Sequence, residues 1–157
     1  MSAAVEIVYE RGGLSVATFK SLCMTAICGP ITSAFLREAS VTGAALARRT
    51  RGKIGALDLV TTAVPLPNAE LRAEAAKLSR ASNERVAAGA NVVHGEGFTA
   101  SAIRSVLTAT TLLSSTPRRT FAQPAPAVEW LAKQLGVPVL DLAPAVEWSE
   151  RVLRAER

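Results

Sequence analysis

The residues best placed to do chemistry follow a short apolar run near the middle of the chain and include two glycines in close succession. The segment reads His94-Gly95-Glu96-Gly97-Phe98-Thr99-Ala100. It matches the G-x-G-x-x-A pattern that binds the pyrophosphate of a dinucleotide where a strand turns into a helix. Such a site also needs an acidic residue about 20 positions later, where this chain has Pro117-Arg118-Arg119-Thr120. We therefore expect no dinucleotide cofactor.

Simpler interpretations of the same glycine turn stay open. The glycines allow a strand and a helix to pack closely, and the hydroxyls that follow then only cap the helix. Alternatively, free backbone N–H groups at the helix start hold an anion, or a kinase phosphorylates one of the hydroxyls. The candidate anion or phosphorylation site consists of Gly95, Gly97, Thr99 and Ser101.

The chain offers few groups for acid–base or metal chemistry. His94 is the single histidine, so neither a Ser-His-Asp triad nor a histidine metal site can form in its usual way. Two acidic residues have positions that suggest a specific role rather than simple exposure to solvent. They are Asp58, within an apolar run, and Glu96, in the glycine turn. Cys23 and Cys28 should point to opposite faces of a strand, which argues against a disulfide or a shared metal. We expect no catalytic residues, no metal and no cofactor, and keep an enzyme of unknown reaction as an alternative.

Alternating strand and helix patterns must position these residues. The strand-like runs are residues 5–10, 14–19, 22–28, 54–64, 90–94 and 119–122, the first two joined by a glycine turn. Helical spacing covers residues 31–46, 68–86, 99–115 and 128–135, with Asn68 as an N-cap. This order predicts an α/β fold with a single mixed β-sheet flanked by helices.

Length and charge fit one compact domain. The chain has 157 residues, 49% of them hydrophobic, and a net charge of +5, and a domain of this size needs no disulfide or metal for stability. Its dense basic cluster, residues 48–53, falls where a helix should end and complements the helix dipole. A phosphate-binding patch is the alternative, but the aromatic side chains that stack on bases are missing there. We therefore expect no binding to nucleic acid.

The sequence also bears on localisation. Charged residues at positions 6, 10 and 11 interrupt the start where a secretory signal would be apolar. The longest uncharged run, residues 21–36, is too short for a membrane span and contains Gly29 and Pro30. We expect a cytoplasmic protein without a membrane span.

The helix predicted at residues 99–115 is unusually poor in charge. Arg104 is its one charged residue, and hydroxyl side chains such as Thr108 share its second face. A helix of this kind should be covered on most of its circumference, either by its own domain or by a partner. In the second case Arg104 would be a polar anchor among small residues that allow close approach.

The end of the chain repeats a motif. Ala-Pro-Ala-Val-Glu-Trp occurs at residues 125–130 and again at 143–148, with proline suited to a first helical turn in both copies. We predict that residues 137–157 form a C-terminal extension with a short strand at 137–142 and a helix. Trp148 and Val152 would dock that helix on its own domain or on another copy.

Part of the sequence resembles a known family. The run Val92-Val93-His94-Gly95-Glu96-Gly97-Phe98-Thr99-Ala100-Ser101-Ala102-Ile103-Arg104-Ser105-Val106-Leu107-Thr108, then Arg119-Thr120-Phe121 and the Ala-x-x-Trp-Leu at residues 127–131, is similar to the bacterial STAS/SEC14-like, or SpoIIAA-like, domains. The similarity covers about residues 4–135, and its most specific part is residues 97–108. It implies a STAS/SEC14-like domain at residues 1–136 that acts by docking to partners.

The resemblance has one departure and leaves two functions open. Some relatives are controlled by a phosphorylated serine after a central strand, where this chain has Pro65-Leu66-Pro67-Asn68, so that switch is not carried over. We expect a non-enzymatic regulatory interaction module, dimeric or bound to a protein partner, and the alternative is a carrier or sensor of a small apolar or lipid ligand. The expected interface residues are Arg104, Thr108, Trp130, Trp148 and Val152.

Overall fold

A computed structural model describes residues 3–61, 64–112 and 114–156. The elements in chain order are β1 (Glu6–Arg11), β2 (Leu14–Phe19), β3 (Leu22–Ile27), α1 (Ser33–Thr50), β4 (Ile54–Thr61), α2 (Ala69–Ser82), β5 (Val86–His94), α3 (Phe98–Thr111), β6 (Arg118–Phe121), α4 (Pro124–Leu135), the 3-10 helix η1 (Val139–Leu142) and α5 (Ala143–Ala155). The predicted alternation of strands and helices is confirmed.

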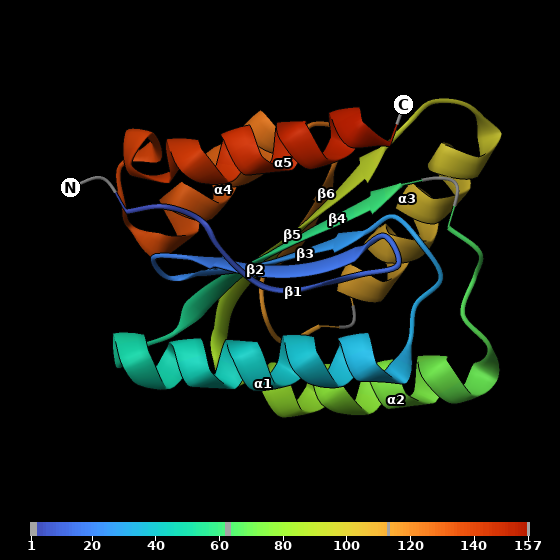
Figure 1. The fold of residues 1–157 in the computed structure, drawn as a ribbon, viewed down its shortest axis with the longest axis horizontal. Coiled ribbons are helices and arrows are strands. Elements are labelled where there is room, and N and C mark those ends of the chain that lie inside the picture. Colours follow the sequence, from blue (N-terminus) through green and yellow to red (C-terminus); the bar gives the residue numbers. More distant parts are fainter. Residues whose placement is uncertain (1–2, 62–63, 113, 157) are drawn as a thin grey trace.

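The six strands form one sheet in the order β1-β2-β3-β4-β5-β6. Strands β1, β2 and β3 pair antiparallel, and β3 to β6 pair parallel, so the predicted mixed sheet is confirmed. Gly12 and Gly13 turn the first hairpin with positive φ angles of 59° and 77°, a conformation that side chains with a Cβ disfavour. Figure 1 shows α4 and α5 on one face of the sheet and α1 and α2 on the other.

Each face of the sheet has its own hydrophobic cluster. The larger lies under α4 and α5 and includes Met24, Leu57, Leu131 and Trp148. The smaller lies under α1 and includes Val16, Cys23, Phe35 and Leu46. Cys23 belongs to the second cluster and Cys28 packs against the first, so the two thiols point to opposite faces as predicted, and both are free.

Two element predictions are wrong. The helix expected to reach Val86 ends at Ser82, because Val86 opens β5 in register with Ile54 of the neighbouring strand. The short strand expected at residues 137–142 is the 3-10 helix η1, in which Asp141 N–H donates to the Pro138 carbonyl. There Leu142 is buried while Leu140 is exposed, and a strand would turn both side chains to the same face.

The C-terminal helix packs on its own chain. Ala145, Trp148 and Leu153 of α5 are all buried in the larger cluster, and Val152 packs against the same cluster. Of the two docking arrangements left open by the sequence, the structure therefore contains the one within a single chain. Among the described residues, no helix is both long and apolar enough to cross a membrane.

Candidate functional site

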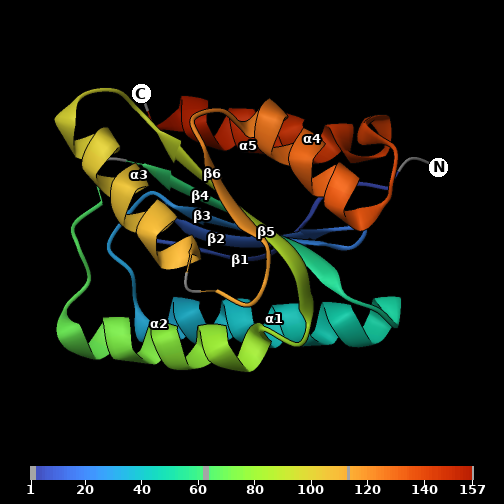
Figure 2. The ribbon, with the colours of Figure 1, turned by 180° about the vertical axis from the view of Figure 1, so that it is seen from behind.

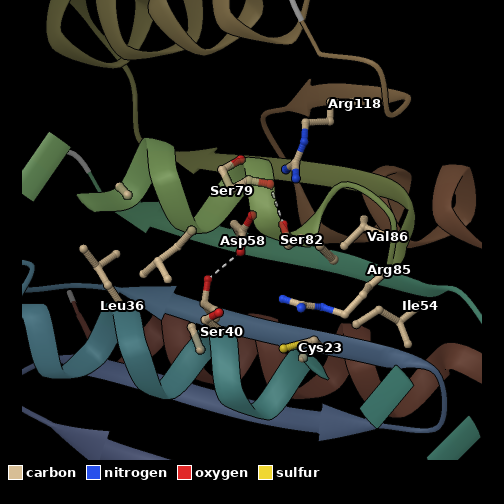
Figure 3. A pocket seen from close by; sticks show the side chains of 16 residues that line it. Cys23, Leu36, Ser40, Ile54, Asp58, Ser79, Ser82, Arg85, Val86 and Arg118 are labelled. Carbon is tan, nitrogen blue, oxygen red and sulfur yellow. Dashed lines mark hydrogen bonds between the residues drawn. The ribbon is translucent and has the colours of Figure 1, made fainter. Parts of the chain in front are cut away.

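A pocket of about 220 Å³ opens between the sheet and the two helices α1 and α2. Figure 3 shows its lining side chains. They are Cys23, Thr25, Leu36, Ala39, Ser40, Gly43, Ile54, Ala56, Asp58, Ala75, Leu78, Ser79, Ser82, Arg85, Val86 and Arg118. We refer to this space as the Asp58 pocket.

A row of polar residues crosses the sheet, and two of its members, Thr25 and Asp58, line the pocket. Thr25, Asp58, Asn91 and Thr120 occupy paired positions on β3, β4, β5 and β6. Paired positions on neighbouring strands turn their side chains to the same face, so these four form a continuous line. Thr25 Oγ1 donates to Asp58 Oδ1 at 2.6 Å, whereas the buried Thr120 Oγ1 has no hydrogen-bond partner among the described residues.

Two arginines bring positive charge to the pocket. Arg118 reaches it from the edge strand β6 by crossing Gly89 on β5, where a Cβ would lie only 2.8 Å from Arg118 Nη1. Arg85 enters from the residue just before β5, and Figure 3 shows both guanidinium groups directed toward the space between helices and sheet. Among the described residues, neither guanidinium forms an ion pair with a carboxylate.

The thiol in the pocket is held in its protonated form. Burial, together with the nearby Asp58 carboxylate, raises the pKa of Cys23 from 9.0 to about 12. Because the thiolate is the reactive form of cysteine, Cys23 acts here as a small apolar side chain.

The two helical walls are tied together at one end. Ser33 Oγ on α1 donates to both carboxylate oxygens of Glu74 on α2, at 2.8 and 2.9 Å, and Arg37 Nε donates to one of them at 3.3 Å. No residue of α2 is buried. This helix is therefore held over the sheet by half-buried side chains and polar ties.

The glycine turn predicted as an anion site is held by a cation of its own chain. Gly95 and Gly97 have positive φ angles of 126° and 90°, as their position in a tight turn requires. Arg104 Nη2 donates to the carbonyls of Val93 and Gly95 at 3.0 and 2.7 Å. Arg104 thus fastens α3 to the end of β5, instead of pointing outward as predicted. Thr99 and Ser101 lie exposed at the start of α3.

The other predicted interface residues are scattered. Trp148 is 3% exposed and offers no surface to a partner in this conformation. Val152 is half-buried against the larger cluster, and Trp130 packs against Phe121 with ring centroids 6.0 Å apart. Thr108 lies exposed on α3. The structure does not bring these residues together at one surface.

The two acidic residues singled out in the sequence lie in different surroundings. Asp58 lines the pocket named after it, and Glu96 is exposed in the turn between β5 and α3. His94 lies in a different hollow, on the α4 and α5 side, with Gln123, Glu150 and Arg154. These groups do not form a paired acid–base site.

An apolar stripe runs along the outer side of α3. Phe98, Ala102 and Val106 follow one another at four-residue spacing, and all three are exposed, Phe98 by 90% and Val106 by 65%. We call these residues the α3 stripe. In the view from behind, α3 lies in front of the sheet, with no other helix covering its outer side (Figure 2).

Comparison with known proteins identifies the fold. No protein-family model matches the chain, and no curated protein does. A solved structure matches it over 82% of this chain and 94% of the other, with a TM-score of 0.55 and 16% sequence identity. That structure is an uncharacterized protein of the DUF3478 family from Shewanella loihica with a SpoIIAA-like fold. The chain therefore has a SpoIIAA-like fold, as its sequence predicted.

Proposed function

We propose that the protein is a non-enzymatic regulatory interaction module that forms a homodimer through the α3 stripe. One observation carries this proposal: α3 is poor in charge, yet its own chain leaves one side of it uncovered. The sequence left two ways to cover such a helix, the interior of its own domain or a partner. Of its described side chains Ala100 is buried, while the stripe faces outward, which supports the partner.

A comparison of two exposed helices supports this reading of α3. The helix α2 also lacks buried residues, but charged side chains cover its outer side, such as Arg72, Lys77 and Arg80. Such a face is stable in water. The α3 stripe instead exposes an aromatic ring and a valine, and exposed apolar patches of this kind mark interaction sites.

A second copy of this chain fits the stripe better than a charged partner. Arg104, the one charged residue of α3, turns inward to the carbonyls of Val93 and Gly95, so two stripes can meet without repulsion between like charges. Small exposed residues beside the stripe, Ser101 and Ser105, allow two helices to approach closely. A two-fold axis needs only that one patch be complementary to itself.

The expected dimer is weak and depends on concentration. Full burial of a side chain such as Phe98 or Val106 contributes about 1.5–3 kcal/mol, and association itself costs an estimated 4–15 kcal/mol. A reversible contact of this strength suits regulation. Thr99 and Ser101 stand beside the stripe at the start of α3, and a phosphate on either would bring negative charge into the contact.

The test is the molar mass of the protein in solution. We expect sedimentation equilibrium to show a mass that rises toward twice that of the chain with increasing concentration, and Val106→Asp to hold it at one chain. Val41→Asp is the matched control, because Val41 is an equally exposed valine, 62%, on α1, and we expect it to dimerise like the wild type. A wild type that stays monomeric, or a Val106→Asp variant that still dimerises, contradicts the proposal.

A further inference from the structure

We propose that the Asp58 pocket binds a short aliphatic acid that carries an ammonium group at its far end. The proposal is independent of the dimer, because the pocket lies between α1, α2 and the sheet and includes no residue of α3. It also differs from a carrier of apolar ligands or lipids, since charged groups of both signs line the space.

The floor of the pocket supplies the recognition of a donor. A carboxylate can accept about four hydrogen bonds, and Thr25 is the donor seen at Asp58, at 2.6 Å. The remaining lone pairs of this half-buried carboxylate adjoin the pocket. A bound ammonium group can donate to these lone pairs and place its positive charge beside the carboxylate.

The opposite charge comes from Arg118 and Arg85. The path of Arg118 into the pocket depends on Gly89, because a Cβ at that position would meet Cγ, Cζ and Nη1 of the arginine at 2.8 to 3.3 Å. The missing side chain on β5 thus lets a guanidinium from the edge strand cross a neighbouring strand. Guanidinium groups bind carboxylates through paired hydrogen bonds, which makes this end of the pocket the place for an acid group.

The sheet register offsets the backbone positions of Arg118 and Asp58 along the strands. Arg118 pairs with Gly89, and Gly89 pairs with Ala56, two residues before Asp58 on β4. Two residues of a strand span about 6.6 Å, and no ion pair joins Asp58 to either arginine among the described residues. A ligand with a charge at each end can bridge a separation that the side chains themselves do not close.

The walls and the volume define the body of the ligand. Aliphatic side chains make up much of the remaining lining, from Leu36 and Ala39 on α1, Leu78 on α2 and Val86 on β5, and Ser40, Ser79 and Ser82 add hydroxyl groups. A space of about 220 Å³ corresponds to roughly seven water molecules at about 30 Å³ each. A short methylene chain fits these walls and this volume.

The experiment uses calorimetric titration with a set of simple probes. The probes are 4-aminobutanoate, 5-aminopentanoate and 6-aminohexanoate, with hexanoate lacking the ammonium group and hexylamine lacking the carboxylate. We expect at least one amino acid of the series to bind the wild type at least about tenfold more tightly than both single-headed probes. No binding by any of the three, or equally tight binding of hexanoate, overturns the proposal.

Matched variants assign the two ends of the ligand. Asp58→Asn keeps an oxygen that accepts from Thr25, so it should fold, and we expect it to weaken the amino acid at least about tenfold without affecting hexanoate. Arg118→Gln should weaken both acids. Arg119→Gln is its control, because Arg119 is the next residue on β6 and stacks over Phe121 at 5.4 Å, outside the pocket lining.

A third variant removes no charge. Gly89→Ala places a Cβ where Arg118 now crosses, and Gly89 has no positive φ angle, so alanine suits the backbone. We expect a folded protein, checked by its melting transition, with weakened binding of the amino acid. Unchanged binding in Asp58→Asn and Arg118→Gln, or in a folded Gly89→Ala variant, contradicts the proposed site, whatever the result for the dimer.

Discussion

The two faces of the sheet differ in the side chains that they bury. Under α4 and α5 the buried side chains form one continuous apolar cluster that includes Leu131, Trp148 and Leu153. Under α1 and α2 the cluster is smaller, and a polar row that includes Asp58 crosses the strands next to a pocket. The difference indicates that the first face supplies most of the stability, which leaves the second free to carry polar groups that cost stability.

The helices differ as well. Five residues of α4 and four of α5 are buried, and on the pocket face α1 also buries four, but α2 buries none. On the pocket side, α2 is held by Glu74 and by half-buried side chains such as Leu78. Three measurements test this difference between the two faces of the sheet.

The largest effect is expected from Trp148→Ala on the apolar face. Trp148 is 3% exposed, and truncating a buried tryptophan to alanine typically costs about 3–5 kcal/mol. Trp130→Ala is the control, because Trp130 holds the same place in the repeated motif but is half-buried. We expect the free energy of unfolding in urea to fall more for Trp148→Ala than for Trp130→Ala. An equal or smaller loss for Trp148→Ala would show that the packing of α5 on the larger cluster contributes little to stability.

A pH-dependent effect is expected on the pocket face. Cys23 keeps its proton in the folded state up to a pKa of about 12, against 9.0 for a free thiol. Above pH 9 the unfolded state therefore releases a proton that the folded state retains. Stability should fall as pH rises from about 9 toward 12, by up to about 1.4 kcal/mol per pH unit, and remain unaffected by this thiol below that range.

The variant Cys23→Ala isolates this contribution, because every other titrating group is common to both proteins. We expect its unfolding free energy to fall less steeply than that of the wild type between pH 9 and the upper limit of the experiment. Parallel curves for the two proteins would mean that the thiol is not desolvated in the folded state, and that water fills the pocket more freely than its lining indicates.

The smallest effect is expected from Glu74→Ala, which cuts the tie between α1 and α2. Hydrogen bonds to a partly exposed carboxylate are worth about 1 kcal/mol, and Ser33 and Arg37 both lose theirs. Lys77→Ala, at an exposed position in the interior of the same helix, should change stability by less. Amide exchange in α2 should quicken in Glu74→Ala but not in the control, and unchanged exchange would place the support of α2 elsewhere.

Much of the fold could be predicted because apolar residues recur at regular intervals in the segments that form the sheet and its helices. Gly12 and Gly13 indicated the hairpin, and Asn68 indicated the start of α2, where its Oδ1 accepts from Leu71 N–H at 2.9 Å. The errors arose where local pattern and packing disagree. Val86 has helical spacing from Leu78 but pairs with Ile54, and only the sheet register decides between the two.

Most of the candidate site could not be predicted from the sequence. Asp58 stood out as a charge in an apolar strand, but its partner Thr25 lies on another strand, 33 residues away. The path of Arg118 over Gly89 depends on which strands are neighbours, which no spacing along the chain reveals. Arg104 was noticed for its isolation on a helix, yet its two carbonyl acceptors belong to the end of β5 and to the turn that follows it.

The strictly sequential strand order has a consequence for biosynthesis. Each strand pairs with the one made just before it, so the sheet can grow stepwise while the chain is still being translated. The helix α5, which packs on the larger apolar cluster, emerges after all six strands. Until then this apolar surface is incompletely covered, and transiently exposed apolar surface favours aggregation.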